Sequence, residues 1–472
     1  MNNKKIIYVL VFFSILFLSL CTYLTTVGVF KKQEYTKKDL GRSLIRESVI
    51  LRGDIYDKNG ERLAYSTISG TTSQRNYPYK NLYSHVIGYY TEKRGSSLIE
   101  NRYTNELSGA YLSDDVIKIT AFLNDKKPKG NDLYLTIDHK LQTRCNTLLS
   151  AYKEGAIIVS NPKTGEILSL VSKPDFDPTP SSLYKNWDKL STDDKKFPFL
   201  TRATQGLYAP GSTYKIITSA ALIANKLDAF TTIDEGNMTI SGTNIKNAKG
   251  KAYGELNLEN AFRLSSNIYF GKAGIEMGAS KLVKCAEDFN LNKEFDVRDM
   301  YIAKSNIQTK DFADDTLALT SIGQGETLIS PIHLNMITGA IANGGKMMEP
   351  RLVASIKSNI DGSEKKTYPK VYLTACEKYV ADAIKDNMRL VVESGTGAGA
   401  NIWNKNVCGK TGTAENERTN DNENATHSWF TAFAPYEDPE VCVTVALAYQ
   451  GSSSIATLVA KSVLNEYFYL YK

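Results

Sequence analysis

One stretch decides the fold and chemistry of this 472-residue chain: Ala209-Pro-Gly-Ser-Thr-Tyr-Lys215, followed by the apolar run Ile216–Ile223. The Pro-Gly pair ends a loop, and the apolar run after it is typical of a buried helix. A serine and a lysine three residues apart lie on one face of a helix, so the Lys215 amine can reach the Ser212 hydroxyl. The helix N-terminus favours a developing negative charge. A lysine that burial keeps neutral can take the serine's proton, which makes Ser212 a candidate nucleophile.

The Ser-x-x-Lys pattern is weak by itself, because it recurs along the chain, for example at Ser150/Lys153, Ser160/Lys163, Ser182/Lys185 and Ser212/Lys215. The local sequence separates these copies. The first lies at a helix end, the second in an expected hairpin turn, and the third in a loop rich in proline, serine and aspartate. Only Ser212 opens an apolar helix, so we assign the nucleophile to it.

A second motif is Ser265-Ser266-Asn267, after an expected helix over residues 258–264. A serine hydroxyl can relay a proton, and an asparagine amide can hold a peptide carbonyl. Taken alone, the same three residues are typical of a helix end, where serine and asparagine are favoured. The motif therefore gains weight only beside the other two.

The third motif is Lys410-Thr411-Gly412-Thr413, which precedes an expected strand over residues 428–433. Lys410 and the strand backbone could bind a peptide that ends in a carboxylate, because Gly412 permits a close backbone approach. Another Lys-Thr-Gly occurs at Lys163–Gly165, where the pattern predicts a hairpin turn instead.

Together, the three motifs resemble a known family. Ser-x-x-Lys, Ser-x-Asn and Lys-Thr-Gly, in this order, are the signature of the penicillin-binding proteins and serine β-lactamases. Class B penicillin-binding proteins are also similar at residues 52–60, 135–142, 163–167, 172–178, 323–325 and 342–345. Residues 31–128 are too few for a glycosyltransferase domain, so the resemblance is to the class B branch with a short pedestal.

The resemblance implies a peptidoglycan D,D-transpeptidase. Ser212 would attack the carbonyl between two D-alanines of a stem peptide, with Lys215 as the base. Ser265 and Lys410 would pass the proton to the leaving amine. The substrate, or a β-lactam, would be bound by Asn267, Thr411, Gly412 and Thr413. An amine of a neighbouring stem would then take the acyl group.

The composition agrees with a folded enzyme that does not bind nucleic acid. There are 57 Lys+Arg against 51 Asp+Glu, and the net charge of +6 comes without a dense basic tract. Six cysteines with no Cys-x-x-Cys pair are not a disulfide framework. The resemblance implies no cofactor and no metal, although a site using Cys408, His427 or Cys442 stays open at this point.

Residues 6–30 contain no formal charge and lack the small-residue cleavage site of a signal peptide. As a helix they would span ~37 Å, more than the ~30 Å hydrocarbon core. Lysines flank both ends, so charge does not fix the orientation. The family does, because its substrate is assembled outside the cell. We therefore expect a cytoplasmic tail (1–5), a transmembrane anchor (6–30), a pedestal (31–128) and a transpeptidase domain (129–472), with most of the chain outside the cytoplasmic membrane.

The expected fold class is α+β. Short, largely apolar runs joined by turns predict strands at 156–159, 167–171, 428–433 and 441–447, with mainly helical patterns between the two pairs. This arrangement predicts an antiparallel sheet whose first and last strands meet. The resemblance adds helices on both faces of the sheet, an all-helical subdomain and a small mixed α/β pedestal.

Two other functions remain open from the sequence. In a D,D-carboxypeptidase, water would replace the acceptor amine. A scaffold would mainly activate a membrane-embedded glycan polymerase of the SEDS type, the membrane partner that the resemblance implies. A β-lactamase is disfavoured, since the chain has no Glu-x-x-x-Asn loop to supply a deacylating carboxylate. The sequence does not distinguish elongation, division and sporulation roles.

Overall fold

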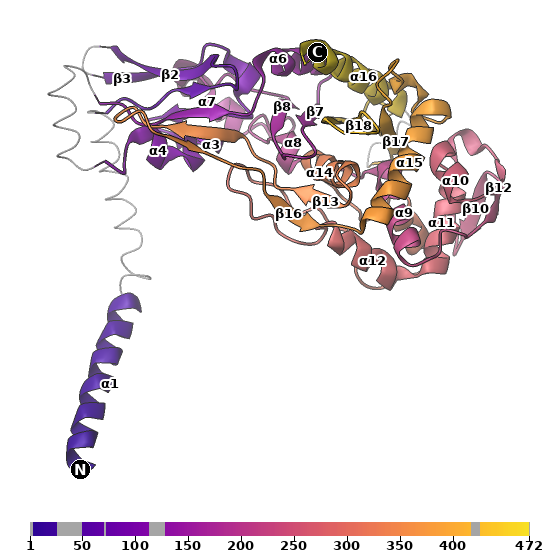
Figure 1. Ribbon diagram of the computed structural model, residues 1–472, viewed down its shortest axis with the longest axis horizontal. Coiled ribbons are helices and arrows are strands. Elements are labelled where there is room, and N and C mark those ends of the chain that lie inside the picture. The colour runs from indigo at the N-terminus through magenta and orange to yellow at the C-terminus, as the bar shows by residue number, and fades with distance from the viewer. Residues whose placement is uncertain (1–2, 26–49, 70–71, 113–127, 417–424, 472) are drawn as a thin grey trace.

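Two larger sheets organise the part of the chain that the computed structural model describes, residues 3–25, 50–69, 72–112, 128–416 and 425–471 (Figure 1). The central one has five antiparallel strands in the order β17-β18-β19-β7-β8. Their bounds are Cys408–Ala414, His427–Ala434, Val441–Leu447, Gly155–Ser160 and Ile167–Lys173. Val443 of β19 pairs with Val159 of β7, so the strands from the two ends of the domain meet as the sequence predicts.

Helices cover both faces of this sheet because its strands alternate two apolar sets. Ile157 and Val159 point toward α6 (His139–Leu149) and α16 (Ser453–Leu470). The intervening Ile158 belongs to the opposite core, with α14 (Pro331–Ala342). All three isoleucine and valine side chains are fully buried, and each stabilises the fold by roughly 1.5–3 kcal/mol. A β-sheet buried on both faces fixes its strand register firmly, which is what an active site along one of its edges requires.

The helical subdomain contains α10 (Leu258–Leu264), α11 (Asn267–Met277), α12 (Ala279–Asp288) and α13 (Asp314–Ser321). It is not all-helical, contrary to the expectation. Between α9 (Lys215–Ala224) and α10, the chain forms the short strands β9 (Thr232–Asp234), β10 (Asn237–Ile240), β11 (Thr243–Lys246) and β12 (Gly254–Leu256). Glycines with positive φ at the turns, such as Gly236 and Gly242, let this polar stretch fold into two small antiparallel pairs.

The second large sheet lies in the pedestal and has the order β15-β14-β6-β1-β2-β3. Strands β1 (Ile55–Tyr56), β2 (Arg62–Ser69) and β3 (Thr72–Asn76) come from the N-terminal part, with α3 (Leu98–Arg102) and α4 (Thr104–Ser108) nearby. Strand β6 (Asp132–Leu135) and the hairpin β14 (Val353–Lys357) and β15 (Glu364–Lys366) complete it from beyond residue 128. In Figure 1 this hairpin reaches across from the transpeptidase part to the pedestal strands.

A buried ionic cluster holds the pedestal together. Glu100 is fully buried and accepts hydrogen bonds from Arg52 Nε at 2.6 Å, Arg75 Nε at 2.8 Å and the Tyr77 hydroxyl at 3.0 Å. Burial alone would raise the pKa of Glu100, but the two guanidinium groups outweigh it and hold the pKa below its usual range. The charges are thus paired and hydrogen-bonded, as buried charges have to be.

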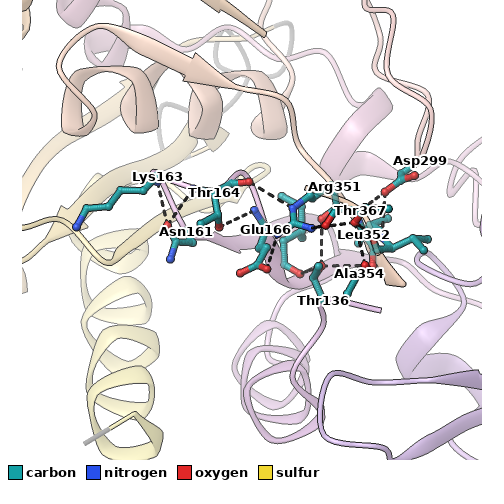
Figure 2. Close-up of polar contacts among 12 residues, drawn as sticks. Thr136, Asn161, Lys163, Thr164, Glu166, Asp299, Arg351, Leu352, Ala354 and Thr367 are labelled. Carbon is teal, nitrogen blue, oxygen red and sulfur yellow. Dashed lines mark hydrogen bonds and ion pairs between the residues drawn. The ribbon is translucent and has the colours of Figure 1, made fainter. Parts of the chain in front are cut away.

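The junction between the two sheets is a polar cluster around Arg351, shown in Figure 2. Arg351 donates to Glu166 Oε1 at 2.6 Å and to the Thr367 hydroxyl at 2.9 Å. Asp299 accepts from the backbone N–H of Leu352 at 2.7 Å and from the hydroxyl of Tyr103 in the pedestal. These contacts tie the β7–β8 turn, the segment leading into β14, and the pedestal to one another.

Helix α1 (Asn3–Thr25) covers most of the segment predicted to be an anchor. Among the residues that the structure describes, no helix meets the combined length and hydropathy expected of a membrane span. The last five residues of the predicted anchor, 26–30, lie outside the described residues.

Candidate active site

Ser212 lies where the sequence places it, in the 3-10 turn Gly211–Tyr214 that leads directly into α9. The preceding loop is fixed on the central sheet, because the indole N–H of Trp429 in β18 donates to the Ala209 carbonyl at 3.0 Å. Gly211 donates its N–H to the Gly323 carbonyl at 2.9 Å. The Ser212 side chain is half-buried beside these contacts, at the start of a helix whose N–H groups face it.

Lys215, the first residue of α9, is fully buried. Its Nζ donates to the Ser265 carbonyl at 2.8 Å, to Asn267 Oδ1 at 2.8 Å and to the Ser265 hydroxyl at 3.4 Å. Within the described part of the chain, its hydrogen bonds go to the second motif and none goes to Ser212. Burial lowers the pKa of Lys215 well below its usual range, and the neighbouring charge of Lys410 lowers it further.

Ser265 connects the two lysines. It is the C-terminal cap of α10 and has a left-handed backbone, with φ of 59° and ψ of 41°. A non-glycine residue there costs on the order of 1–3 kcal/mol and is typical of functional sites. The conformation places its hydroxyl within 2.8 Å of Lys410 Nζ and 3.4 Å of Lys215 Nζ. Ser265 therefore ends a helix, which the sequence of the motif alone would suggest, and it also links the Ser-x-x-Lys and Lys-Thr-Gly motifs.

Lys410, in β17, is fully buried like Lys215. Besides Ser265, its Nζ donates to the Thr411 carbonyl at 3.2 Å and lies 5.5 Å from the centre of the Phe262 ring. Burial lowers the pKa of Lys410 to about 7. A lysine with this pKa exchanges protons near neutral pH, as a group that relays protons requires.

Asn267 begins α11, and its amide lies between two other groups. Its Oδ1 accepts from Lys215 at 2.8 Å, and its Nδ2 donates to the Lys246 carbonyl of β11 at 2.7 Å. The side chain is half-buried. The structure thus brings Asn267 into the lysine cluster, where its amide links Lys215 to β11.

Strand β17 carries the third motif along the edge of the central sheet. Gly412 has to be glycine, because a Cβ there would lie 2.8 Å from the Pro210 carbonyl oxygen and 2.8 Å from the Thr213 side chain. Thr413 is exposed, and its hydroxyl accepts from the Ser453 N–H at 3.3 Å. The Thr411 hydroxyl is buried and bonded to the Thr396 hydroxyl at 2.7 Å.

The other copies of the motifs lie elsewhere. Ser150 bonds its own helix at Thr147, Ser160 bonds Asn335, and Ser182 bonds Asn186. The second Lys-Thr-Gly forms the β7–β8 turn beside Arg351 (Figure 2), as predicted. A Cβ at Gly165 would lie 2.1 Å from the Glu349 carbonyl oxygen, so this glycine serves packing.

A metal site using Cys408, His427 and Cys442 has no geometric support. Cys408 pairs with Phe433 at one end of the β17–β18 hairpin, whereas His427 pairs with Ala414 at the other end. Among the residues that the structure describes, no group of three His, Cys, Asp or Glu side chains is arranged so that it could hold a metal ion. Burial raises the pKa of the Cys408 thiol above its usual range, as expected of a structural thiol.

Two residues near the site were not predicted from the sequence. Asp234 of β9 is buried and accepts a hydrogen bond from Ser266, the middle residue of the second motif. Asn247 bonds Asp234 and also accepts the N–H of Asn267 at 2.7 Å. The only sequence signal for them is their place in a polar, glycine-rich stretch, which by itself reads as a loop.

A serine at a helix start, with two buried amines and a bridging hydroxyl behind it, can be acylated and can move the protons that acylation releases. The fold and site thus define a serine acyltransferase. Comparison with known proteins agrees: the model for the penicillin-binding protein transpeptidase domain matches residues 155–466, and that for the penicillin-binding protein A dimerisation domain matches residues 52–133. The chain belongs to the penicillin-binding protein transpeptidase family, in the class B branch that includes PbpA.

Its relatives include the peptidoglycan D,D-transpeptidase PbpA of Mycolicibacterium smegmatis, 30% identical over 88% of this chain and 87% of that protein. Among solved structures, penicillin-binding protein A of M. tuberculosis as an imipenem acyl-enzyme matches with a TM-score of 0.81 and 28% identity, over 89% of this chain and 99% of that one. A D,D-transpeptidase domain from Eggerthella lenta matches with a TM-score of 0.79 and 31% identity, over 90% and 99%.

Proposed function

We propose that the chain is a serine-type peptidoglycan D,D-transpeptidase that is acylated on Ser212. The observation that carries the proposal is the chain of contacts Lys215–Ser265–Lys410, which joins the start of α9 to β17, the edge strand of the central sheet. This arrangement supplies a nucleophile, two groups able to exchange protons and a strand edge for an extended peptide. The acyl-enzyme structures of penicillin-binding protein A support the same chemistry.

In the proposed acylation, Ser212 Oγ attacks the carbonyl carbon between two D-alanines of a stem peptide. Lys215 takes the hydroxyl proton, which it can do because burial and Lys410 favour its neutral form. The tetrahedral intermediate then collapses as the C–N bond breaks. Ser265 and Lys410 give a proton to the leaving amine of D-alanine, through the 2.8 Å contact between them. An amine of a second stem then attacks the ester and restores Ser212.

The donor peptide is proposed to lie along β17, adding to the sheet edge through its main chain. Asn267 would hold its carbonyl or amide, and Thr411 and Thr413 its terminal carboxylate. The backbone N–H groups of Ser212 and Thr413 would bind the oxyanion, each worth roughly 3 kcal/mol in the transition state. The exposure of the Thr413 hydroxyl and the half-buried amide of Asn267 support this placement.

The test is covalent labelling of the full-length protein in detergent with a fluorescent penicillin, followed by intact mass and peptide mapping. We expect one adduct, on Ser212, that is absent from Ser212→Ala and persists for hours. An adduct on another residue would contradict the assignment. A folded wild-type protein that forms no adduct would instead favour the scaffold function.

The same preparation separates transpeptidase from carboxypeptidase. With a stem-peptide donor, we expect released D-alanine to be matched by a cross-linked product whenever an acceptor amine is present. If release is as fast without an acceptor and no cross-link forms, water is the acceptor and the chain is a D,D-carboxypeptidase.

We also propose that residues 6–30 anchor the chain in the cytoplasmic membrane, with residues 1–5 inside. Residues 31–128 are then an extracytoplasmic pedestal, and residues 129–472 are the transpeptidase domain. Support comes from the uncharged run over 6–30 and from α1, where Phe12, Ile15 and Leu18 are 60%, 65% and 71% exposed. Exposed apolar side chains along a helix favour contact with lipid.

A membrane partner follows from this placement: a SEDS-type glycan polymerase, contacted through the anchor and pedestal. The test compares the full chain with a variant lacking residues 1–30 after washing membranes with alkaline carbonate. The full chain should stay in the membrane fraction and co-purify with the polymerase, and the truncated one should do neither. Recovery of the full chain in the wash would overturn the anchor.

A further inference from the structure

A carboxylate that no motif predicts is buried beside the site. Asp234, the last residue of β9, is 1% exposed. Within the described part of the chain, no lysine, arginine or histidine lies within salt-bridge distance of it. A buried carboxylate without a cation destabilises the fold unless neutral hydrogen-bond donors surround it. The contacts of Asp234 therefore have to be identified.

Neutral donors do surround Asp234. The amide of Asn247 lies 2.8 Å from both carboxylate oxygens, and the Gly236 N–H donates to Oδ1 at 2.8 Å. The Ser266 hydroxyl donates to Oδ2. Four hydrogen bonds from three residues thus fix the carboxylate, one of them from the middle residue of the Ser265-Ser266-Asn267 motif.

The same network fixes the start of α11. A helix leaves its first N–H groups without partners in the helix, and here side chains accept them. Asn247 Oδ1 accepts from Asn267 at 2.7 Å and from Ile268 at 3.4 Å. Ser266 Oγ accepts from Tyr269 at 2.9 Å. Since Asn267 and the Ser265 carbonyl both bind Lys215, the network anchored on Asp234 sets where the lysine's partners lie.

Asp234 also acts on the site through its charge. Of the charged groups that act on Lys215, Lys410 from β17 lowers its pKa further, as burial does, whereas Asp234 from β9 raises it. Near Asp234, Tyr253 has a raised pKa, which keeps it neutral, and the Lys272 ammonium is bonded to the Ile233 carbonyl at 2.9 Å. The neighbouring carboxylate of Glu235 is exposed to solvent. The charge of Asp234 therefore opposes two influences that favour a neutral Lys215.

We propose that Asp234 and Asn247 are positioning residues of the acylation site: together they hold the second motif beside Lys215, and Asp234 places a negative charge in this network. The inference rests on the proposed function, because it concerns the lysines that would move the proton of Ser212. Neither residue touches the reacting atoms, and both act through Ser266, Asn267 and Lys215.

The test measures the second-order rate of acylation by a fluorescent penicillin against pH, using the full-length chain. Asp234→Asn removes the charge and keeps the size. Its amide oxygen can still accept from Gly236 and Asn247, and its new amide nitrogen can donate to the Ser266 hydroxyl, so that only the second contact with Asn247 is lost. Lys215 should then lose its proton more readily, and the acidic limb of the profile should move down by about half a pH unit or more. The matched control is Glu235→Gln, the same change on the exposed neighbouring residue, whose profile should not move.

Ser266→Ala tests the positioning half separately. It removes one hydrogen bond to Asp234 and the cap of α11 without changing any charge, so the acylation rate should fall several-fold at every pH while the limb stays in place. A purely structural role for Asp234 would lower the amount of folded protein but would not shift the limb. If Asp234→Asn does not fold, the proposal is tested on Ser266→Ala and Asn247→Ala instead. If both of these variants are acylated at the wild-type rate, the proposal is wrong.

The outcomes separate this inference from the proposed function. If the wild-type chain forms no adduct on Ser212, the function fails before Asp234 is tested. If the wild type is acylated and the profile of Asp234→Asn coincides with it, only the role of Asp234 fails.

Discussion

The pedestal and the active site both bury charged side chains, but only the pedestal pairs them. Glu100 lies between Arg52 and Arg75, each bonded to it through a nitrogen 2.6–2.8 Å away. Lys215 and Lys410 are equally buried, and among the described residues their nitrogens contact only hydroxyl, carbonyl and amide groups. The pairing holds the pKa of Glu100 below its usual range, whereas burial lowers the pKa of both lysines, which have no paired carboxylate to offset it.

The difference separates a structural use of buried charge from a chemical one. A paired cluster contributes to a specific fold and resists any change of protonation. The buried amines of Lys215 and Lys410, which have no carboxylate partner, lower the stability of the fold, but they can release a proton near neutral pH. The following predictions test this contrast.

The largest effect is expected at the lysines. Lys215→Met and Lys410→Met should each lower the acylation rate by roughly 10²–10⁴-fold, because a positioned proton acceptor or donor is lost. Both variants should fold, since methionine fills a similar space without a charge to bury. The measurement is fluorescent-penicillin labelling over time, with circular dichroism as the fold control. Labelling at the wild-type rate would show that the amines of Lys215 and Lys410 do not take part in the acylation chemistry.

The opposite result is expected for the pedestal. Glu100→Ala leaves two buried guanidinium groups without their partner and should lower the free energy of unfolding by roughly 3–5 kcal/mol. The protein that remains folded should be acylated at the wild-type rate. Urea unfolding and active-site titration measure the two quantities. Glu166→Ala is the control, since the Glu166–Arg351 pair is partly exposed and should contribute less. Equal losses in both variants would contradict the contrast.

A smaller effect concerns the pH dependence of stability. The pKa of Lys410 is lowered to about 7 in the folded chain, from a usual value near 10.5. Between these values the unfolded chain binds more protons than the folded one, so stability rises with pH across this window. Lys410→Met should remove that contribution and be more stable than the wild type by up to a few kcal/mol at pH 7. The gain should shrink as the pH approaches 10. A melting temperature below that of the wild type at pH 7 would contradict this explanation.

The smallest effect is expected at the second Lys-Thr-Gly. Lys163 pairs with Asp438 on the surface, where the two side chains are 41% and 77% exposed. Lys163→Met should change stability by less than about 1 kcal/mol and leave acylation unchanged. It is also the matched control for Lys410→Met, because both replace the lysine of the same tripeptide. Any loss of acylation would mean that the β7–β8 turn takes part in the chemistry.

Local pattern and motif order were enough to predict the central sheet. The apolar runs at Ile157–Val159 and Val441–Leu447 predicted strands of the two hairpins, and burial on both faces leaves one consistent register where they meet. The position of Ser212 at a helix start followed from Pro210-Gly211 and the apolar run after them. These features depend on neighbours in sequence, which a pattern can describe.

Features that depend on distant segments were not predicted. Asp234 and Asn247 reach the second motif only because β9–β12 fold against α11, and their own sequence reads as a polar loop. The expectation that Lys215 contacts the Ser212 hydroxyl used helical spacing alone. In the structure the Lys215 amine instead donates to Ser265 and Asn267, which lie at the end of α10 and the start of α11. The contribution of β14 and β15 to the pedestal sheet was missed for the same reason.

That shared sheet has a consequence for how the protein is made. Strand β6 pairs with β14, and Leu135 lies opposite Val353. The edge of β6 therefore stays unpaired until residue 353 has been synthesised. While the ribosome is still producing the residues between them, the pedestal carries an open edge that could pair with other chains. Such long-range pairing also folds slowly. The newly made chain should therefore depend on chaperones until the β14–β15 hairpin has been synthesised, and a fragment that ends before residue 353 should aggregate instead of forming a soluble pedestal.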